Sequence, residues 1–338
     1  MRFGQNPLKY TKKEIESPAE ITVGVLNYIP EQTGYFQGQF DALKLCLASI
    51  RSNADQAFDL LLVDNGSCQE VQHYLTDELK AGRITYLILN ERNICKANAQ
   101  MQILRSSPGD LVFYSDGDIY YRPGWMQTHL QVLKYFPEAG IVGGIPLRNL
   151  AYFHTAPSRC WAEENQSKLL LEKGDLIPES WTRDFLSSVG DERFIDNWIN
   201  NEDWRVTRGS TTAYIGASHM QFLIPRNVIE LIPHHRFGMA LSPIDDQYLD
   251  DTIESSGFLR LSTDHPTVYH IGNTITEDWL LEEYHRLVEN SEASKTPERS
   301  ESNRKDKSAL NWLWRRRRIL NIIKAIHEWT FKVYYENV

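Results

Sequence analysis

The sequence predicts an α/β fold in which helices cover both faces of a mostly parallel β-sheet. Two observations predict it. Between residues 20 and 145, short apolar runs alternate with segments whose apolar residues recur every three or four positions. Polar residues cluster where the short runs end. Such alternation builds a parallel sheet, and ligands of these sheets bind at the carboxyl ends of the strands.

Nine elements are expected in this region. The expected strands are 21–26, 58–63, 84–89, 111–114 and 141–144. The expected helices are 40–50, 71–79, 93–104 and 123–135. Strand 111–114 reads Leu-Val-Phe-Tyr, the continuous apolar pattern of a strand that is buried on both faces. The last helix begins with Pro123, which the first turn of a helix tolerates.

Composition narrows the class of protein. The chain has 338 residues, of which 41% are hydrophobic, so it can bury a core as one large domain or two smaller ones. Its formal net charge of −9 argues against a nucleic-acid-binding protein, which would carry a basic face. The four cysteines form no metal-type or CxxC spacing, and the first 19 residues, an N-terminal extension, lack an apolar signal core. We therefore expect a cytoplasmic protein without a spanning helix.

The most informative stretch follows strand 111–114, where Asp116-Gly117-Asp118 places two carboxylates on a loop. Two carboxylates at the end of a buried strand are costly unless a cation neutralises them, and oxygen ligands suit Mg²⁺ or Mn²⁺. A partly hydrated ion could then bind phosphate oxygens. The alternative is an acidic surface turn, because Asp-Gly is a common turn dipeptide.

Other polar residues should converge on the same crevice. Asn27-Tyr28 follows the first expected strand, and Asp64-Asn65-Gly66-Ser67 follows the second. Both stretches end parallel strands, so they should meet the two aspartates at one edge of the sheet. Taken alone, such residues have simpler interpretations. Residues 64–67 are all turn formers, and Lys96, in the expected helix 93–104, could be a solvated helix residue.

Four runs in order, VGVLNY, LLVDNGS, NICKANAQ and YSDGDIYYRPGW, resemble the nucleotide-binding half of glycosyltransferase family 2, which has the GT-A fold. The resemblance covers residues 20–145 closely and 215–273 more loosely. It implies that nucleotide-sugar contacts come from Leu26, Asn27, Tyr28, Asp64, Asn93, Lys96 and Asp116. It also implies that Asp116 and Asp118 form the DxD motif, which holds Mn²⁺ or Mg²⁺ on the diphosphate. Cys95 and Met101 replace a glycine and an asparagine that many relatives have, which leaves the base and the sugar open.

A second part of the resemblance concerns the catalytic base. Asp245-Asp246-x-x-Leu249 resembles the family's Glu-Asp-x-x-Leu, which implies that Asp246 is the base, with Asp245 beside it. Inverting sugar transfer needs a base for the acceptor hydroxyl, and a neighbouring carboxylate raises the pKa of that base. The alternative is an acidic first helical turn, favoured by the helix dipole, which suits Asp250 and Asp251 better.

Two further features belong to the second half, residues 146–286. Related transferases often place a histidine at the position of His270 as a third metal ligand, although a lone histidine at a strand end is more often structural. Residues 146–214 are rich in aromatic side chains and resemble the family weakly. We expect this insertion to shape the acceptor site or a lid, although aromatic residues also fill cores.

These observations predict an inverting, metal-dependent glycosyltransferase that moves a sugar from a nucleotide-sugar to a hydroxyl acceptor such as a glycan, a lipid-linked acceptor or a polysaccharide precursor. Two alternatives remain. One is a catalytically silent nucleotide-sugar-binding or scaffold protein. The other is a nucleotidyltransferase, although the glycine-rich phosphate loop expected after its first strand is absent.

The C-terminal segment is distinct. Residues 287–308 are polar and form an expected linker, and residues 309–338 are expected to form a basic amphipathic helix. Its apolar stripe and its four arginines at 315–318 would suit the anionic inner face of a membrane, to which the transferase would bind peripherally. The same stripe would equally suit packing on the catalytic domain or self-association.

If residues 309–338 bind anionic membrane, the full chain should float with vesicles that contain anionic lipid, and a chain that ends at Ser308 should not. A flotation assay measures this. If the full chain stays in the soluble fraction, or if truncation changes the oligomeric state instead, the helix is an assembly element.

Overall fold

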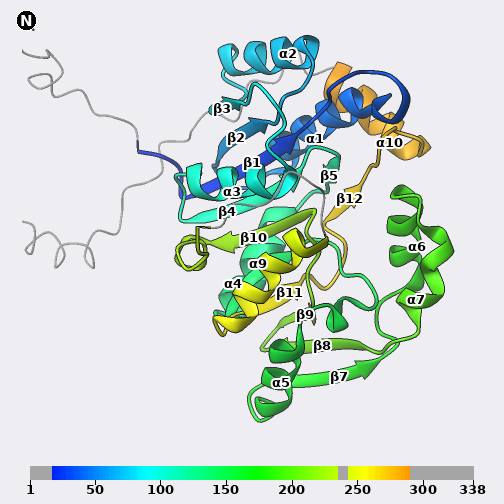
Figure 1. The fold of residues 1–338 in the computed structure, drawn as a ribbon. Coiled ribbons are helices and arrows are strands. Elements are labelled where there is room, and N and C mark those ends of the chain that lie inside the picture. The colour runs from blue at the N-terminus through cyan, green and yellow to red at the C-terminus, as the bar shows by residue number, and fades with distance from the viewer. Residues whose placement is uncertain (1–16, 235–242, 290–338) are drawn as a thin grey trace, which may run out of the picture. The chain divides into compact units, whose positions relative to one another are not determined.

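The chain folds around a mixed β-sheet, shown in Figure 1 from β3 at one end to β7 at the other. The computed structural model describes residues 17–234 and 243–289, which belong to one compact unit. Within these ranges the sheet has ten strands in the order β3-β2-β1-β4-β10-β6-β11-β9-β8-β7. Their bounds are β1 Ile21–Asn27, β2 Asp59–Asp64, β3 Tyr86–Leu89, β4 Leu111–Asp116, β6 Ala139–Gly143, β7 Leu170–Gly174, β8 Asp203–Arg208, β9 Thr211–Ile215, β10 Gln221–Pro225 and β11 Leu259–Ser262.

The two halves of the sheet differ in strand direction. Strands β3, β2, β1 and β4 are parallel, as the alternation of strands and helices predicts. Strand β10 then runs antiparallel to both β4 and β6, while β6 and β11 are parallel to each other. Beyond them, β9, β8 and β7 are antiparallel, and the tight turn Gly209-Ser210 joins β8 directly to β9. The α/β class is confirmed, and the parallel order is confined to the first half and the β6–β11 pair.

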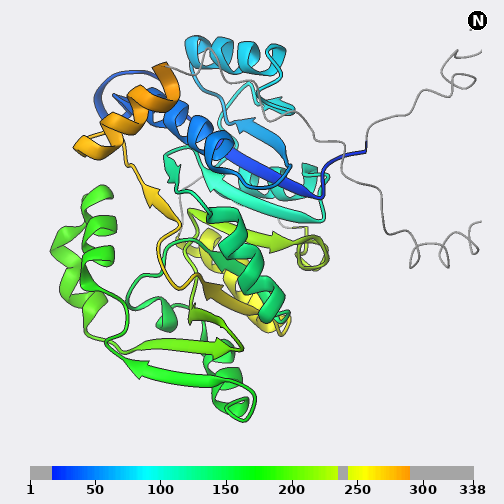
Figure 2. The same cartoon turned by 180° about the vertical axis from the view of Figure 1, so that it is seen from behind.

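Helices cover both faces of the sheet, as comparison of Figures 1 and 2 shows. Helices α1, α2 and α4 contribute to the core on one face, and α3, α8 and α9 to the core on the other. Side chains of a strand alternate between the two: Leu60 and Leu62 join the first core, Leu61 and Val63 the second. The helix bounds are α1 Gln39–Asn53, α2 Gln69–Lys80, α3 Lys96–Ser106, α4 Trp125–Tyr135, α5 Ala156–Glu164, α6 Glu179–Ser188, α7 Ile195–Ile199, α8 Arg226–Ile229, α9 Pro243–Ser255 and α10 Asp278–Tyr284.

Helix α3 packs very close to the middle of β1. A Cβ atom on Gly24 would lie 2.2 Å from Cγ2 of Ile103, so a larger residue would push α3 away from the sheet. This close packing brings the first residue of α3, Lys96, toward the carboxyl end of β4.

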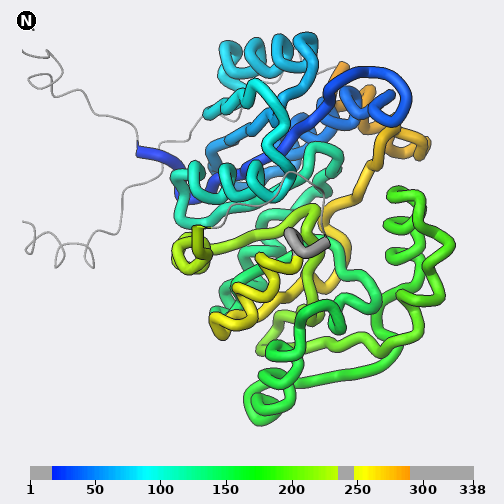
Figure 3. The backbone as a smooth tube through the Cα atoms, viewed as in Figure 1, coloured from blue at the N-terminus to red at the C-terminus, as the bar shows by residue number. Residues whose placement is uncertain are grey.

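Two further short strands form a separate two-stranded sheet. Strand β5 (Ile119–Tyr121) pairs antiparallel with β12 (Val268–His270), which places His270 opposite Ile119. In Figure 3 the chain continues from β12 to α10, beside α1. There Leu280 and Leu287 pack against Leu45. Leu287 lies in a short π-helical turn that ends at Glu289, so the folded unit extends into the segment expected as a linker.

All nine elements expected between residues 20 and 145 are present, with ends that shift by three residues or fewer. The short strand β5 was not expected, because three residues carry too little pattern. No helix in the described ranges combines the length and the apolar character needed to cross a membrane. The expected tail helix, 309–338, and most of the N-terminal extension lie outside the described residues.

Candidate active site

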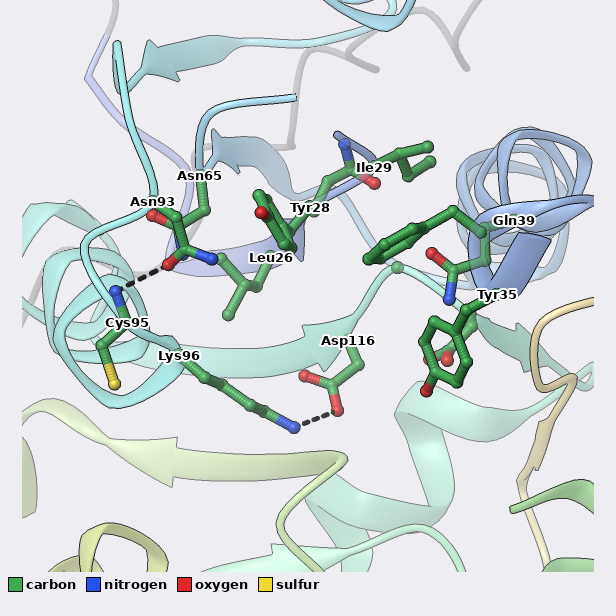
Figure 4. A pocket seen from close by; sticks show the side chains of 14 residues that line it. Leu26, Tyr28, Ile29, Tyr35, Gln39, Asn65, Asn93, Cys95, Lys96 and Asp116 are labelled. Atoms are coloured by element: carbon green, nitrogen blue, oxygen red, sulfur yellow. Dashed lines mark hydrogen bonds and ion pairs between the residues drawn. The ribbon is translucent and has the colours of Figure 1, made fainter. Parts of the chain in front are cut away.

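The candidate site is a cavity of about 640 Å³ at the carboxyl ends of β1 and β4. The predicted residues that line it are Leu26, Asn27, Tyr28, Asn93, Lys96, Asp116 and Asp118. Figure 4 shows Asn65 and Asn93 on one side of the cavity, Tyr35 and Gln39 on the other, and Asp116 between them. The structure thus brings these predicted side chains to the sheet edge at which we expected them.

Asp64 lies behind this wall instead of in it. Its carboxylate is fully buried and accepts hydrogen bonds from Asn27 Nδ2 at 2.9 Å, from the Ser67 backbone N–H at 3.0 Å and from Gln72 Nε2 at 3.2 Å. Asn27 Nδ2 also donates to Ser67 Oγ at 3.0 Å. Asp64 therefore orients Asn27, which does line the cavity, and its predicted direct contact with a nucleotide stays a prediction.

Two asparagines fix the loop that leads into α3. Asn65 Nδ2 donates to Asn93 Oδ1 at 3.0 Å, and the Cys95 backbone N–H donates to the same oxygen at 2.8 Å. Asn65 Oδ1 in turn accepts from the Ile94 backbone N–H at 3.0 Å. Cys95 has a positive φ of 76°, which a glycine adopts without strain and other residues adopt at a cost. The asparagine network holds the loop in this strained shape at the cavity wall.

Lys96 and Asp116 form the central ion pair of the site. Lys96 Nζ lies 2.7 Å from Asp116 Oδ2, and the Tyr114 hydroxyl donates to Asp116 Oδ1 at 2.6 Å (Figure 4 shows the ion pair). Burial raises the pKa of Asp116 above its ordinary value, an effect that the positive charge of Lys96 opposes. Lys96, whose side chain is 40% exposed, is thus the counter-ion of a largely buried carboxylate.

Asp118 has a different partner, His270, which strand pairing brings to it from β12. His270 Nε2 lies 3.4 Å from Asp118 Oδ2, and the Ile271 backbone N–H donates to the Asp118 carbonyl at 2.8 Å. Burial favours the neutral forms, but the hydrogen bond and the opposite charges outweigh it. They hold the pKa of Asp118 below, and the pKa of His270 above, the ordinary values. The second ring nitrogen of His270, Nδ1, lies 2.8 Å from Ser188 Oγ.

Comparison with known protein families finds one that resembles part of this chain. A family model described as Glycosyl transferase family 2 matches residues 36–188. The matched part contains Asn93, Lys96, Asp116 and Asp118, and the predicted resemblance is confirmed. The match covers less than half of the chain, so the family resemblance applies to this part of it.

The chain also has a distant similarity to several solved structures. S. aureus TarS 1-349 is 11% identical over 80% of this chain and 64% of its own, with a TM-score of 0.43. TarS 1-349 in complex with UDP-GlcNAc is 14% identical over 37% of this chain and 34% of its own, with a TM-score of 0.30. GalNAc-T7 with UDP, GalNAc and Mn²⁺ is 12% identical over 81% and 48%, with a TM-score of 0.48.

The chain spans less than two thirds of each of these structures. Because their TM-scores are below 0.5, these structures do not support an assignment. The resemblance rests on the family match alone. No curated protein matches the sequence.

The donor atoms of the site determine whether it could hold a metal ion. No group of three or more His, Cys, Asp and Glu side chains in residues 17–234 and 243–289 is arranged to hold a metal ion by itself. The predicted set of Asp116, Asp118 and His270 is not preformed, because the Asp116 carboxylate is engaged by Lys96 and Tyr114. Asp118 Oδ1, however, is buried without a hydrogen-bond partner among the described residues, and such an oxygen suits a cation. The residues therefore fit a divalent ion whose coordination a substrate completes.

The acidic cluster in α9 divides into two parts. The helix begins at Pro243, so Asp245 and Asp246 belong to its first turn, and their side chains lie outside the described residues. The sequence-based assignment of Asp250 and Asp251 to a first turn is wrong, because both follow the helix start by about two turns. Asp250 is instead explained by its buried ion pair with Arg260, whose Nη2 lies 2.8 Å from Asp250 Oδ2.

Several cavity residues were not predicted from sequence. Tyr35 and Phe36 reach the cavity from a 3₁₀ turn, Gly34–Phe36, and Gln39 from the start of α1. No hydrophobic periodicity marks such residues in the sequence. Asn65, by contrast, stands in the polar stretch 64–67 that pointed to the crevice, although its role had not been assigned.

The raised pKa of His270 predicts a pH dependence. A protonated imidazole cannot bind a metal, so Mn²⁺ affinity in the presence of a nucleoside diphosphate should rise with pH until His270 is deprotonated, above pH 6.5. Calorimetric titration between pH 5.5 and 8.5 measures this, with the expected slope reaching about tenfold per pH unit.

The matched variant is His270→Gln, which does not titrate. Because a diphosphate also binds protons in this range, the readout is the difference between the two proteins. His270→Gln should show the shallower profile. Identical profiles would remove His270 from the metal site.

Proposed function

We propose that this protein is an inverting, metal-dependent glycosyltransferase that transfers a sugar from a nucleotide-sugar to a hydroxyl of a glycan, a lipid-linked acceptor or a polysaccharide precursor. The observation that carries the proposal is one continuous cavity that joins aromatic and amide groups to two carboxylates. The first kind of group suits a nucleoside, and the second suits a metal-bound diphosphate.

The nucleoside would bind at the aromatic end of the cavity. Tyr28 and Phe36 line it with their rings 5.8 Å apart and nearly perpendicular, and Tyr35 lies beside them with its side chain largely exposed. Aromatic faces of this kind stack on bases. Asn65 and Asn93 offer amide groups for ribose hydroxyls. The proposal thus assigns the base and ribose to residues near the carboxyl end of β1, together with Leu26 and Asn27.

The diphosphate would lie between Lys96 and Asp118. Lys96 Nζ is held at the cavity wall by Asp116 and would contact phosphate oxygens as a positive charge. Asp118 and His270 would hold Mn²⁺ or Mg²⁺, with Asp116 as a further oxygen donor. Bound there, the ion would offset the charge that develops on the departing nucleoside diphosphate.

Transfer itself would need a base for the acceptor. In the proposed step, the acceptor hydroxyl oxygen forms a bond to the anomeric carbon while the bond from that carbon to the diphosphate oxygen breaks. The electron pair leaves with the nucleoside diphosphate, and Asp246 takes the hydroxyl proton. Attack from the face opposite to the leaving group inverts the anomeric configuration.

A cytoplasmic location, with residues 309–338 at the inner face of a membrane or in self-association, belongs to the same proposal. It rests on the sequence pattern alone.

Replacement of the metal ligand tests the proposal most simply. Asp118→Ala should abolish the Mn²⁺-dependent part of nucleoside diphosphate binding, because it removes a buried oxygen that has no hydrogen-bond partner in the described part of the chain. The fold should survive, since the side chain supports no core. Calorimetry of UDP, GDP and dTDP, each with Mn²⁺ and with EDTA, measures the effect.

Asp77→Ala is the matched control, since Asp77 is an exposed aspartate on α2 that pairs only with Lys80 in the described structure. It should bind as the unchanged chain does. Unaltered affinity and metal dependence in Asp118→Ala would refute the metal assignment.

Replacement of the base separates binding from chemistry. Asp246→Asn keeps the shape of the side chain and removes its basicity, so donor binding should persist while transfer falls by about 10²-fold or more. Asp245→Asn is the neighbouring control and should retain more activity. If Asp245→Asn abolishes turnover while Asp246→Asn stays active, the base is Asp245.

A further inference from the structure

A second cavity, of about 490 Å³, lies between α6 and β12. Trp181 and Phe185 line it from α6, and Tyr269 and His270 line it from β12. Arg122, which follows β5 directly, completes this wall. Helix α6 belongs to the aromatic-rich segment 146–214, so that segment supplies one side of a cavity and not only core.

The second cavity meets the first at one pair of side chains. His270 lines the second cavity, Asp118 lines the first, and their closest side-chain atoms are 3.4 Å apart. The Phe185 ring packs edge-on against the His270 ring with centroids 5.9 Å apart, which holds the imidazole between the two spaces. A molecule in the second cavity would therefore lie next to the carboxylates at which the donor diphosphate is proposed to bind.

The walls of this cavity suit a sugar ring. Trp181, Phe185 and Tyr269 offer apolar faces on which a ring can stack, while Ser180 and Asp184 offer groups that bond hydroxyls. No such alternation of aromatic and polar groups is needed to fill a core. Since the donor has a cavity of its own, the second one fits the acceptor.

Arg122 adds a charge requirement. Its guanidinium lies over the indole of Trp279, with 5.0 Å between the central carbon and the ring centroid, which fixes the plane of the group. Its Nε is buried, and among the described residues neither a hydrogen-bond partner for this atom nor an ion pair for the guanidinium is present. Buried donors are almost always paired in folded proteins. A planar fork of unpaired N–H groups matches a carboxylate or a phosphate.

The carboxylate in the wall of this cavity orients the ligand. Asp184 also lines the wall and does not pair with Arg122 in the described structure. A carboxylate repels an anion and accepts from hydroxyls, so the anionic group would lie at the Arg122 end and sugar hydroxyls at the Asp184 end.

We propose that the acceptor of this glycosyltransferase carries an acidic sugar unit, whose carboxylate or phosphate pairs with Arg122 while its ring packs on Trp181 and Tyr269. This inference rests on the proposed function and specifies its acceptor.

Ligand-observed NMR with the full chain tests the inference, using three probes: glucuronate, glucose 6-phosphate and methyl glucoside. At least one acidic probe should bind about tenfold more tightly than the neutral one, the scale of a charged hydrogen bond. Preferential binding of glucuronate would indicate a carboxylate ligand, and preferential binding of glucose 6-phosphate would indicate a phosphate ligand. Trp181→Ala should weaken all three probes, which locates them in this cavity.

Arg122→Gln should remove the preference for acidic probes and leave methyl glucoside binding unchanged. Arg193→Gln is the matched control, since Arg193 is a surface arginine whose side chain is 76% exposed, and it should keep the preference. If Arg122→Gln does not fold, Arg122→Lys serves instead. It keeps the charge but loses the fork, and it should bind acidic probes more weakly than the unchanged chain does.

Equal binding of acidic and neutral probes, or an Arg122 variant with unaltered preference, would overturn the inference. Mn²⁺-dependent nucleoside diphosphate binding, measured on the same samples, separates the two proposals. If that binding persists while acidic probes fail, only the acceptor inference is wrong. If it is absent as well, the proposed function fails with it.

Discussion

The candidate site depends on two partly buried carboxylates, Asp116 and Asp118, at the carboxyl end of β4 near the middle of the sheet. Charges removed from water cost several kcal/mol each unless a partner of opposite charge compensates them. Asp116 obtains Lys96 from the start of α3, and Asp118 obtains His270 from the end of β12. Lys96 comes from the helix that directly precedes β4, whereas His270 comes from a strand far away in the sequence. The packing of α3 on β1 and the pairing of β12 with β5 thus serve the same local requirement.

This arrangement also divides the space around the sheet edge. Lys96 and Asp116 lie in the wall of the first cavity, and His270 stands between Asp118 and the second. A donor and an acceptor placed in the two cavities would meet at the carboxylates, where charge develops during transfer. The buried Asp250–Arg260 pair ties α9 to β11 and so fixes the helix whose first turn contains Asp246.

Local pattern predicted the parallel half of the fold well, because strand β4 and its neighbours are long apolar runs that end in polar residues. The DxD position followed from the same pattern. The placement of His270 with Asp118 was predicted only from the family resemblance, because a pairing of two three-residue strands leaves no local signal in the sequence. Arg122 was missed for a similar reason: before a proline it looks like an ordinary turn residue, and only tertiary packing gives it Trp279 and a cavity. The placement of Asp250 failed because the start of α9 at Pro243 was not identified.

The central claim is that these two carboxylates serve sugar transfer and not only nucleotide binding. Release of the nucleoside diphosphate from UDP-, GDP- and dTDP-sugars by the full chain, with Mn²⁺ and without an acceptor, measures it most directly. We expect slow release from at least one donor, which EDTA abolishes. Tight, metal-dependent binding of a nucleotide-sugar that is never hydrolysed, even with acidic acceptors present, would contradict it and identify a catalytically silent binding protein.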